Sequence, residues 1–207
     1  MSIPWKPQPP KPPTTPAIPP LLSLPANAPS RAIQLLQVDP DFPMDHATRM
    51  MRTAAAIASH AGVRLTYPPI AKFLQPAWIH FTEDMLPSVR HYAAQHQNHI
   101  ALLVKTIFIA RPTDTRFVGG LGGGRYCLIA AGAALPTLCH EILHPALGAA
   151  RIDEPDGHRN VPRNVMNGRV FSGSDTNIDP DQAAALRQWA SKSAAARVVD
   201  EERVWVC

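Results

Sequence analysis

The chain has 207 residues, of which 17% are charged, and a formal net charge of +4 at pH 7. Its lysines and arginines are scattered and form no basic run with interleaved aromatic residues, so the sequence gives little support to nucleic-acid binding. No stretch is apolar over the roughly 20 residues that a membrane-spanning helix requires, so we expect no membrane partner.

Many of the 23 prolines lie near the start of the chain. Because proline disrupts helix and sheet interiors, we predict a disordered Pro-rich arm over residues 1–30 and a single folded domain over residues 31–207. Overlapping PxxP segments between Pro7 and Pro13 could bind a partner's aromatic-lined groove, and a simple spacer is the plainer interpretation. Prolines also interrupt any signal-peptide core, which leaves a cytoplasmic protein, export without a cleaved signal, or a trimmed chain open.

Helices and strands are expected to alternate over the following hundred residues. A helix can begin at Asp45, a suitable capping residue, and continue to about His60, with Gly62 as its end. The run 100–110 is nearly all apolar and rich in Val and Ile, which predicts one central, buried strand. The remaining predictions are short strands at 63–67, 78–81 and 126–130 and a helix at 86–97.

A glycine-rich run covers residues 119–124. It lacks the Lys-Ser/Thr pair of a phosphate-binding loop and does not open a helix, so we predict a mobile loop over a cleft instead. Upstream of it, His91, His96 and His99 have spacings of five and three, which do not stack on one helix face. We therefore interpret these three histidines as surface residues.

The three cysteines of the chain are Cys127, Cys139 and Cys207. Their odd number and the absence of a CxxC spacing fit a reducing compartment slightly better than a disulfide framework. Cys139 adjoins a histidine but points to a different face of the predicted helix, so we interpret it as a buried core thiol.

The pentapeptide HExxH, at residues 140–144, is the most informative feature of the chain. On a helix, His140 and His144 lie on one face and can direct both imidazoles at one zinc ion, with the Glu141 carboxylate beside them. The run from Ala133 to His144 is predicted to be helical, with Pro136 where a first-turn proline is tolerated. Pro145 should kink or end this helix near His144, and Gly148 is a natural end.

Downstream features strengthen this interpretation. From Arg125 to Trp189 the chain resembles the metzincin zinc metallopeptidases, especially the matrixin-like members, whose pattern is HExxHxxGxxH, a methionine-bearing Met-turn and a closing helix. The matching features are HExxH, Gly148, Met166 within NVMN, and a helix that opens at Asp179-Pro180 and continues to about Ser193. The resemblance implies an α+β, zincin-like fold: a mixed twisted sheet, an active-site helix carrying HExxH, and a C-terminal helix.

The third zinc ligand of the family pattern is missing from its usual place. Gly148 stands four residues after His144 instead of three, and the third histidine would fall at Ala150 or Arg151, neither of which binds zinc. His158 opens the run HRNVPRNVM, which resembles the matrixin segment from the third histidine to the Met-turn. Asp153 is the alternative ligand, because some metzincins use an aspartate.

The chemistry expected of such a site is zinc-dependent peptide hydrolysis. Zinc acidifies its bound water and polarises the substrate carbonyl, and Glu141 acts as general base and then as general acid. The resemblance implies that Met166 forms an apolar floor beneath the histidines and binds no metal. Protein or peptide chains are the expected substrates. Substrate preference and oligomeric state stay open. The mode of latency also stays open, because the arm contains no cysteine that could block the zinc.

Two other readings of the sequence remain. A catalytically degenerate zincin-like binding module, recruited through the Pro-rich arm, would account for the missing ligand at Ala150. The intact Glu141 argues against it, because a purely structural zinc site gains nothing from a general base. An exported effector or toxin with the same peptidase domain differs in biology and not in chemistry.

Overall fold

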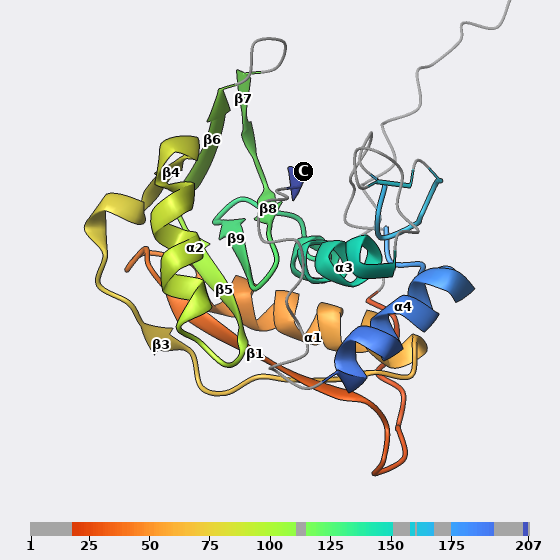
Figure 1. The fold of residues 1–207 in the computed structure, drawn as a ribbon. Helices are drawn as coiled ribbons and strands as arrows, with labels where there is room; N and C mark the ends of the chain where they lie inside the picture. Colours follow the sequence, from red (N-terminus) through yellow and green to blue (C-terminus); the bar gives the residue numbers. More distant parts are fainter. Residues whose placement is uncertain are drawn as a thin grey trace, which may run out of the picture.

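The computed structural model describes residues 18–110, 115–150, 158–159, 161–167, 175–192 and 205–206. In this part of the chain a mixed sheet carries helices on both faces (Figure 1). The large sheet has the strand order β10-β8-β9-β5-β1-β2, and β3 also pairs with β1. Its strands are β1 (Ser30–Gln37), β2 (Arg64–Thr66), β3 (Ala71–Lys72), β5 (His99–Val104), β8 (Gly120–Gly122), β9 (Tyr126–Ala130) and β10 (Trp205–Val206).

The remaining elements pack around this sheet. A second sheet has the order β4-β6-β7, formed by β4 (His80–Thr82), β6 (Thr106–Ala110) and β7 (Thr115–Val118). The helices are α1 (Met44–His60), α2 (Leu86–Ala94), α3 (Thr137–Ala150) and α4 (Pro180–Ser191), with short 3-10 helices at Pro76–Trp78 and Glu83–Met85.

Strand direction changes at one edge of the large sheet. The central strands β9, β5, β1 and β2 run parallel, as the pairs Leu102↔Leu128 and Leu35↔Ala101 illustrate. Beyond β9 the sheet turns antiparallel, because β8 pairs antiparallel with β9 and β10 pairs antiparallel with β8. Helix α3 packs against β8 and β9, so the HExxH segment lies at this antiparallel edge.

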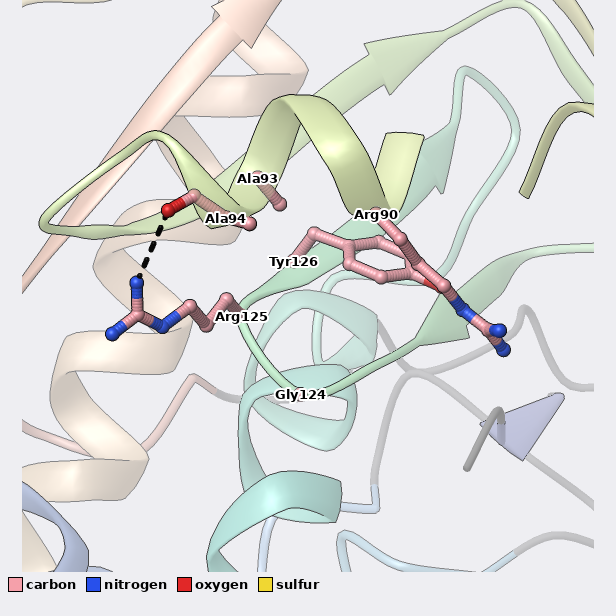
Figure 2. Close-up of a pocket in the computed structure, with 6 residues that line it drawn as sticks. All are labelled: Arg90, Ala93, Ala94, Gly124, Arg125 and Tyr126. Atoms are coloured by element: carbon pink, nitrogen blue, oxygen red, sulfur yellow. Dashed lines mark hydrogen bonds between the residues drawn. The ribbon is translucent and has the colours of Figure 1, made fainter. Parts of the chain in front are cut away.

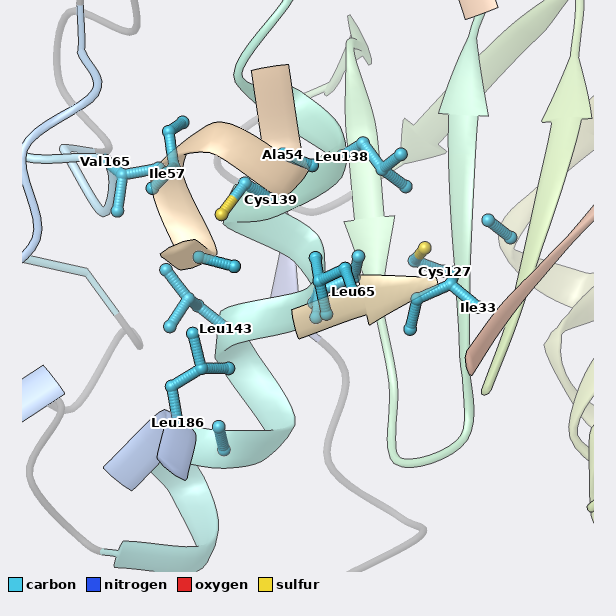
Figure 3. Close-up of a cluster of buried hydrophobic side chains, with 14 of the residues drawn as sticks. Ile33, Ala54, Ile57, Leu65, Cys127, Leu138, Cys139, Leu143, Val165 and Leu186 are labelled. Atoms are coloured by element: carbon cyan, nitrogen blue, oxygen red, sulfur yellow. The ribbon is translucent and has the colours of Figure 1, made fainter. Parts of the chain in front are cut away.

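Alternating side chains divide the core between the two faces of the sheet. On β5, Ala101 and Leu103 point to the cluster that holds α1, α3 and α4, and Leu102 points to the cluster that holds α2 and the small sheet. Figure 3 shows the first cluster, in which Leu143 from α3 and Leu186 from α4 meet. All of these strand positions are buried, which explains why the central strands are apolar without interruption.

The structure confirms several predicted elements. The predicted strand at 126–130 is β9, and α1 ends at His60 before Gly62, which has a φ of +76° and so favours glycine. The cap of α1 differs from the prediction: Pro43 occupies the cap position, and Asp45 lies in the first turn without capping it. The predicted strand at 63–67 and the helix at 86–97 are shorter, as β2 and α2. The strand predicted at 78–81 is shifted to His80–Thr82 as β4, because Trp78 belongs to a 3-10 helix.

The prediction of one strand over 100–110 was wrong. The run forms two strands in different sheets: β5 in the centre of the large sheet and β6 in the small one. The break falls at Lys105, an exposed residue whose N–H donates to the Ile79 carbonyl at 2.8 Å and thus leads the chain from one sheet to the other. A nearly continuous apolar run has no period that marks such a crossing, although β6, unlike β5, alternates buried and more exposed residues.

Helix α3 is longer than predicted. It begins at Thr137, directly after Pro136, and continues through Pro145 and Gly148 to Ala150. Pro145 removes one hydrogen bond of the helix, yet Ala146 and Leu147, which follow it, are buried in the core. Burial of this second half stabilises the helix against the local effect of the proline.

The predicted Pro-rich arm is described only in its last part. Residues 1–17 lie outside the described residues. Residues 18–29 run along α1 and β2, where the Ser59 hydroxyl accepts a hydrogen bond from Leu22 N–H (3.0 Å) and the Arg64 guanidinium donates to the Pro25 carbonyl (2.9 Å). This end of the arm therefore contacts the domain. Among the described residues, no helix is both long and apolar enough to cross a membrane.

Candidate metal centre

Helix α3 brings three polar side chains of the HExxH segment into the protein interior. His140, Glu141 and His144 each have 0% of their surface exposed. The rings of His140 and His144 face one another one helical turn apart, with centroids 4.8 Å apart and ring planes at 76°. Burial of three such groups costs free energy unless they bind a partner, so this cluster is unusual for a core helix.

His158 completes a group of three imidazoles. Its ring centroid lies 5.3 Å from that of His140 and 5.2 Å from that of His144. The ligand atoms of the three side chains all lie within 4.8 Å of one another, and all three residues are buried. In the described part of the chain, no other group of three or more His, Cys, Asp or Glu side chains comes together in this way.

Main-chain and ion-pair contacts hold His158 in place through its neighbour Arg159. The Arg159 N–H donates to the Met166 carbonyl at 2.8 Å. Its guanidinium donates to Asp179 (2.9 Å) and Asp181 (2.7 Å), at the start of α4. Arg159 holds the pKa of the Asp181 carboxyl below its usual value, chiefly through this hydrogen bond. His158 is thereby tied to α4, although neither it nor Arg159 belongs to a helix or strand.

The turn around Met166 reaches the histidine cluster through the hydrogen bond between His140 and the Val165 carbonyl. Asn164 and Gln182 exchange buried side-chain hydrogen bonds of 3.0 and 3.2 Å, and the Asn164 side chain also accepts the Met166 N–H at 2.8 Å. Met166 itself is fully buried within the α3 and α4 cluster. Arg163 has a φ of 65°, so the turn includes one residue in the left-handed region.

One hydrogen bond of this turn orients a histidine. His140 Nδ1 lies 2.6 Å from the Val165 carbonyl oxygen, which can only accept, so Nδ1 carries the proton and Nε2 is left as the atom with a lone pair. Burial, with the nearby His158 ring as a lesser cause, lowers the pKa of His140 to about 3. A neutral imidazole with a fixed tautomer is the form that zinc binds, and three nitrogen ligands with a carboxylate beside them suit zinc better than magnesium or calcium.

The carboxylate of Glu141 lies against the glycines of β8. A Cβ atom at Gly120 would come within 2.2 Å of Glu141 Oε1, and one at Gly122 within 2.8 Å of Glu141 Oε2. Both distances are shorter than contacts that real Cβ atoms make, so only glycine leaves room for the carboxylate here. The prediction of a mobile loop over 119–124 was wrong for its central residues, because Gly120–Gly122 form a buried strand paired with β9.

If this centre binds zinc and hydrolyses peptides, as the sequence predicts, Gly120→Ala should lower peptide hydrolysis by up to about 100-fold and leave the zinc content unchanged. The added methyl group would displace the Glu141 carboxylate and also meet Thr137 Cγ2 at 2.7 Å, but it lies near no imidazole among its closest contacts. The measurement is kcat/KM beside metal content. Gly132→Ala is the matched control, since a Cβ there meets nothing within 4 Å. Full activity in Gly120→Ala would show that the Glu141 position is not constrained by β8.

The other candidate residues lie elsewhere. Asp153, the alternative ligand, lies outside the described residues. His91 is exposed as predicted, but His99 is fully buried, against the prediction, and its ring contacts Trp189 edge-on at 5.9 Å. Burial lowers the pKa of His99 to about 3, so it is a neutral core residue. The prediction for His99 failed because the sequence pattern placed the start of this strand at residue 100, whereas His99 is the first residue of the fully buried strand β5.

The cysteines behave as the sequence predicts where they are described. Cys127 and Cys139 are buried free thiols, and burial raises the pKa of Cys139 to about 12. A thiol with so high a pKa is protonated near neutral pH and is therefore a poor nucleophile. Cys207 lies outside the described residues.

A small pocket adjoins the other end of the glycine run. It lies between α2 and the start of β9, where the Arg90 side chain lies beside the Tyr126 ring and Arg125 donates to the Ala94 carbonyl at 3.5 Å (Figure 2). Its volume is about 10 Å³, about the least that holds one water molecule. This pocket is therefore too small for a substrate.

Comparisons with known proteins support the fold. No family model matches the chain, and no curated protein sequence is significantly similar to it. Among solved structures, the chain is similar to metalloproteinase-II from Bacteroides fragilis, with a TM-score of 0.53 and 13% identity over 84% of this chain. It is also similar to an archaemetzincin from Methanopyrus kandleri, with a TM-score of 0.50 and 15% identity over 80% of this chain.

The two similar structures differ in how much of each is matched. The alignment covers 98% of the archaemetzincin but only 57% of the Bacteroides enzyme, so the chain spans little more than half of the latter. At this identity the likeness concerns the fold: a mixed sheet with helices that two metalloproteinases share. The fold is therefore consistent with the zincin-like architecture that the HExxH resemblance predicted.

Proposed function

We propose that this chain is a zinc-dependent, metzincin-like endopeptidase. The observation that carries the proposal is the convergence of His140, His144 and His158, three buried imidazoles from two distant segments, beside the buried carboxylate of Glu141. Three nitrogen ligands are the number that a catalytic zinc site uses, because the fourth position must stay open to water or substrate. The likeness to two metalloproteinase structures supports the same assignment at the level of the fold.

In this proposal each residue has a distinct task. His140, His144 and His158 hold the zinc, and the Val165 carbonyl keeps His140 in the tautomer that leaves Nε2 for the ion. When bound, zinc supplies a Lewis acid that acidifies water and polarises a peptide carbonyl. Glu141 accepts the proton of the attacking water and returns it to the nitrogen of the leaving amine. Met166 holds the turn that carries the Val165 carbonyl beneath the site.

The architecture also favours an extended peptide as substrate. The carboxylate of Glu141 lies against β8, whose outer side faces the edge of the large sheet. An extended chain that adds to such an edge forms main-chain hydrogen bonds that depend little on its sequence. This arrangement suits an enzyme that cleaves within a polypeptide. The Pro-rich arm remains a candidate site for a separate partner, as its PxxP segments suggest.

We expect the purified chain to bind about one zinc ion and to lose both zinc and peptidase activity on treatment with a strong chelator. Adding zinc back should restore both, whereas magnesium should not, because a site of three imidazoles disfavours a hard cation. Metal analysis and a panel of quenched fluorescent peptides measure the two quantities in parallel. Zinc at one equivalent with no cleavage of any unfolded protein would instead favour the binding-module alternative.

A further inference from the structure

Hydrogen bonding determines which edge of β8 is open to another chain. Ala130 N–H donates to the Gly119 carbonyl, and Gly123 N–H donates to the Tyr126 carbonyl, both at 2.9 Å. Alternate residues of a strand direct their main-chain polar groups to opposite edges. The N–H and C=O groups of Gly120 and Gly122 therefore point away from β9, toward the outer edge of the sheet.

A segment from near the end of this chain already lies on that edge. Strand β10 pairs antiparallel with β8, with Trp205 opposite Gly122 and Val206 opposite Leu121. In Figure 1 it is the short arrow beside β8, close to α3. The main chain at Trp205 thus faces the main-chain groups of Gly122 that are not bonded to β9.

The paired position is next to the candidate metal centre. A Cβ atom on Gly122 would lie 2.8 Å from Glu141 Oε2 and 3.4 Å from His144 Cδ2. Gly122 is thus the point at which the sheet edge, the carboxylate and a histidine meet. Any chain that adds to β8 at Gly122 is held alongside the residues that would carry out hydrolysis.

We infer that residues 205–206 occupy the substrate-binding edge of β8 and so act as a built-in competitor of peptide substrates. This inference rests on the proposed peptidase function. The contact uses main-chain groups in an antiparallel pair, which is the way an extended peptide adds to a sheet edge. It also covers a strand edge that would otherwise be open to non-specific pairing with other chains. The chain thereby carries a mode of latency that needs no cysteine.

The size of the effect follows from the fraction of molecules in which the edge is free. A competitor that is part of the same chain acts at constant effective concentration and raises the apparent KM by the inverse of that fraction. If β10 is paired in nine molecules of ten, removing it lowers KM about tenfold and leaves kcat nearly unchanged. An inhibitory segment that acted on the chemistry itself would change kcat instead.

The test compares the zinc-loaded full chain with a chain that ends at Arg203. We expect kcat/KM of the shortened chain to rise about tenfold, through KM. The synthetic peptide Arg-Val-Trp-Val-Cys, which copies residues 203–207, should then inhibit the shortened chain competitively. Equal KM values for the two chains, or no inhibition by the peptide, would overturn the inference.

Two proline variants separate the main-chain contact from other effects of the change. Proline at position 205 removes the N–H that faces Gly122, whereas the N–H of residue 206 points away from β8. We expect Trp205→Pro to reproduce the low KM of the shortened chain and Val206→Pro to retain the KM of the parent. The opposite order of the two KM values would contradict the register.

A readout that does not depend on activity distinguishes failure of this inference from failure of the proposed function. The amide of Gly122 should exchange its hydrogen faster in the shortened chain than in the full chain, whether or not either chain cleaves peptides. Faster exchange with no peptidase activity in either chain would retain the strand pairing and reject the peptidase. Full activity in both chains with unchanged exchange would retain the peptidase and reject the competitor.

Discussion

Replacing Glu141 by glutamine is expected to abolish peptide hydrolysis without removing the metal. Glutamine keeps the size of the side chain, which lies between α3 and the glycines of β8, but cannot accept a proton from water. General acid-base catalysis contributes roughly 10²–10⁴-fold to rate, so we expect kcat/KM of Glu141→Gln to fall by about that factor. The measurement is kcat/KM for one cleaved peptide, with zinc content determined on the same preparation.

The control for this variant is a carboxylate remote from the centre. Glu83 lies in the first turn of a short 3-10 helix and is exposed, so Glu83→Gln should leave both the rate and the zinc content at the level of the parent. If Glu141→Gln retained full activity with zinc bound, a different group would have to accept the proton, and the role that we propose for Glu141 would be wrong.

Removing His158 is expected to release the zinc and with it the activity. His158→Ala leaves two imidazoles on α3, and two ligands do not hold a catalytic zinc site. Loss of even an outer contact of a zinc site typically lowers affinity 10–100-fold, so we expect loss of a direct ligand to weaken zinc binding by more than about 100-fold. Zinc content after dialysis and kcat/KM measure the two losses. Thermal stability should also lose its dependence on added zinc.

Two variants test the specificity of that result. Asp153→Ala removes the alternative ligand that the sequence suggests, and it should retain zinc at one equivalent per chain. His96→Ala removes a histidine outside the cluster and should do the same. Loss of zinc in Asp153→Ala, together with retention in His158→Ala, would assign the third position to the aspartate.

The contacts around His158 indicate how the three imidazoles are brought together. His158 is fixed through Arg159, whose guanidinium donates to Asp179 and Asp181 at the start of α4 and whose N–H donates to the Met166 carbonyl. Helix α4 in turn is capped by Asp179 and Gln182, and Gln182 bonds to Asn164 below the site. The position of His158 thus depends on the docking of the closing helix, whereas His140 and His144 lie on α3 and only the orientation of His140 depends on the Val165 carbonyl.

Local sequence signals determined where several helices and strands lie and which two histidines share a helix face. The HExxH spacing by itself places His140 and His144 on one helix face, because a helix returns to the same side every 3.6 residues. The capping residues Asp179 and Gln182 determine where α4 begins, and its predicted extent agrees with Pro180–Ser191 to within two residues at its end. The strand at Tyr126–Ala130 follows from a short apolar run bounded by turn residues. In each case the physical cause acts over a few neighbouring residues.

Tertiary structure decided what depends on contacts between distant residues. Sequence spacing does not show that the His158 ring lies beside the other two imidazoles, and the folded chain places its centroid 5.3 and 5.2 Å from theirs. The alternative ligand Asp153 lies outside the described residues. The run 100–110 gave no clear sign of its division between two sheets, because both halves are largely apolar. The need for glycine at Gly120 arises from the Glu141 carboxylate, 21 residues away along the chain. Sequence periodicity reports only which face of an element is buried, whereas these features depend on which element packs against that face.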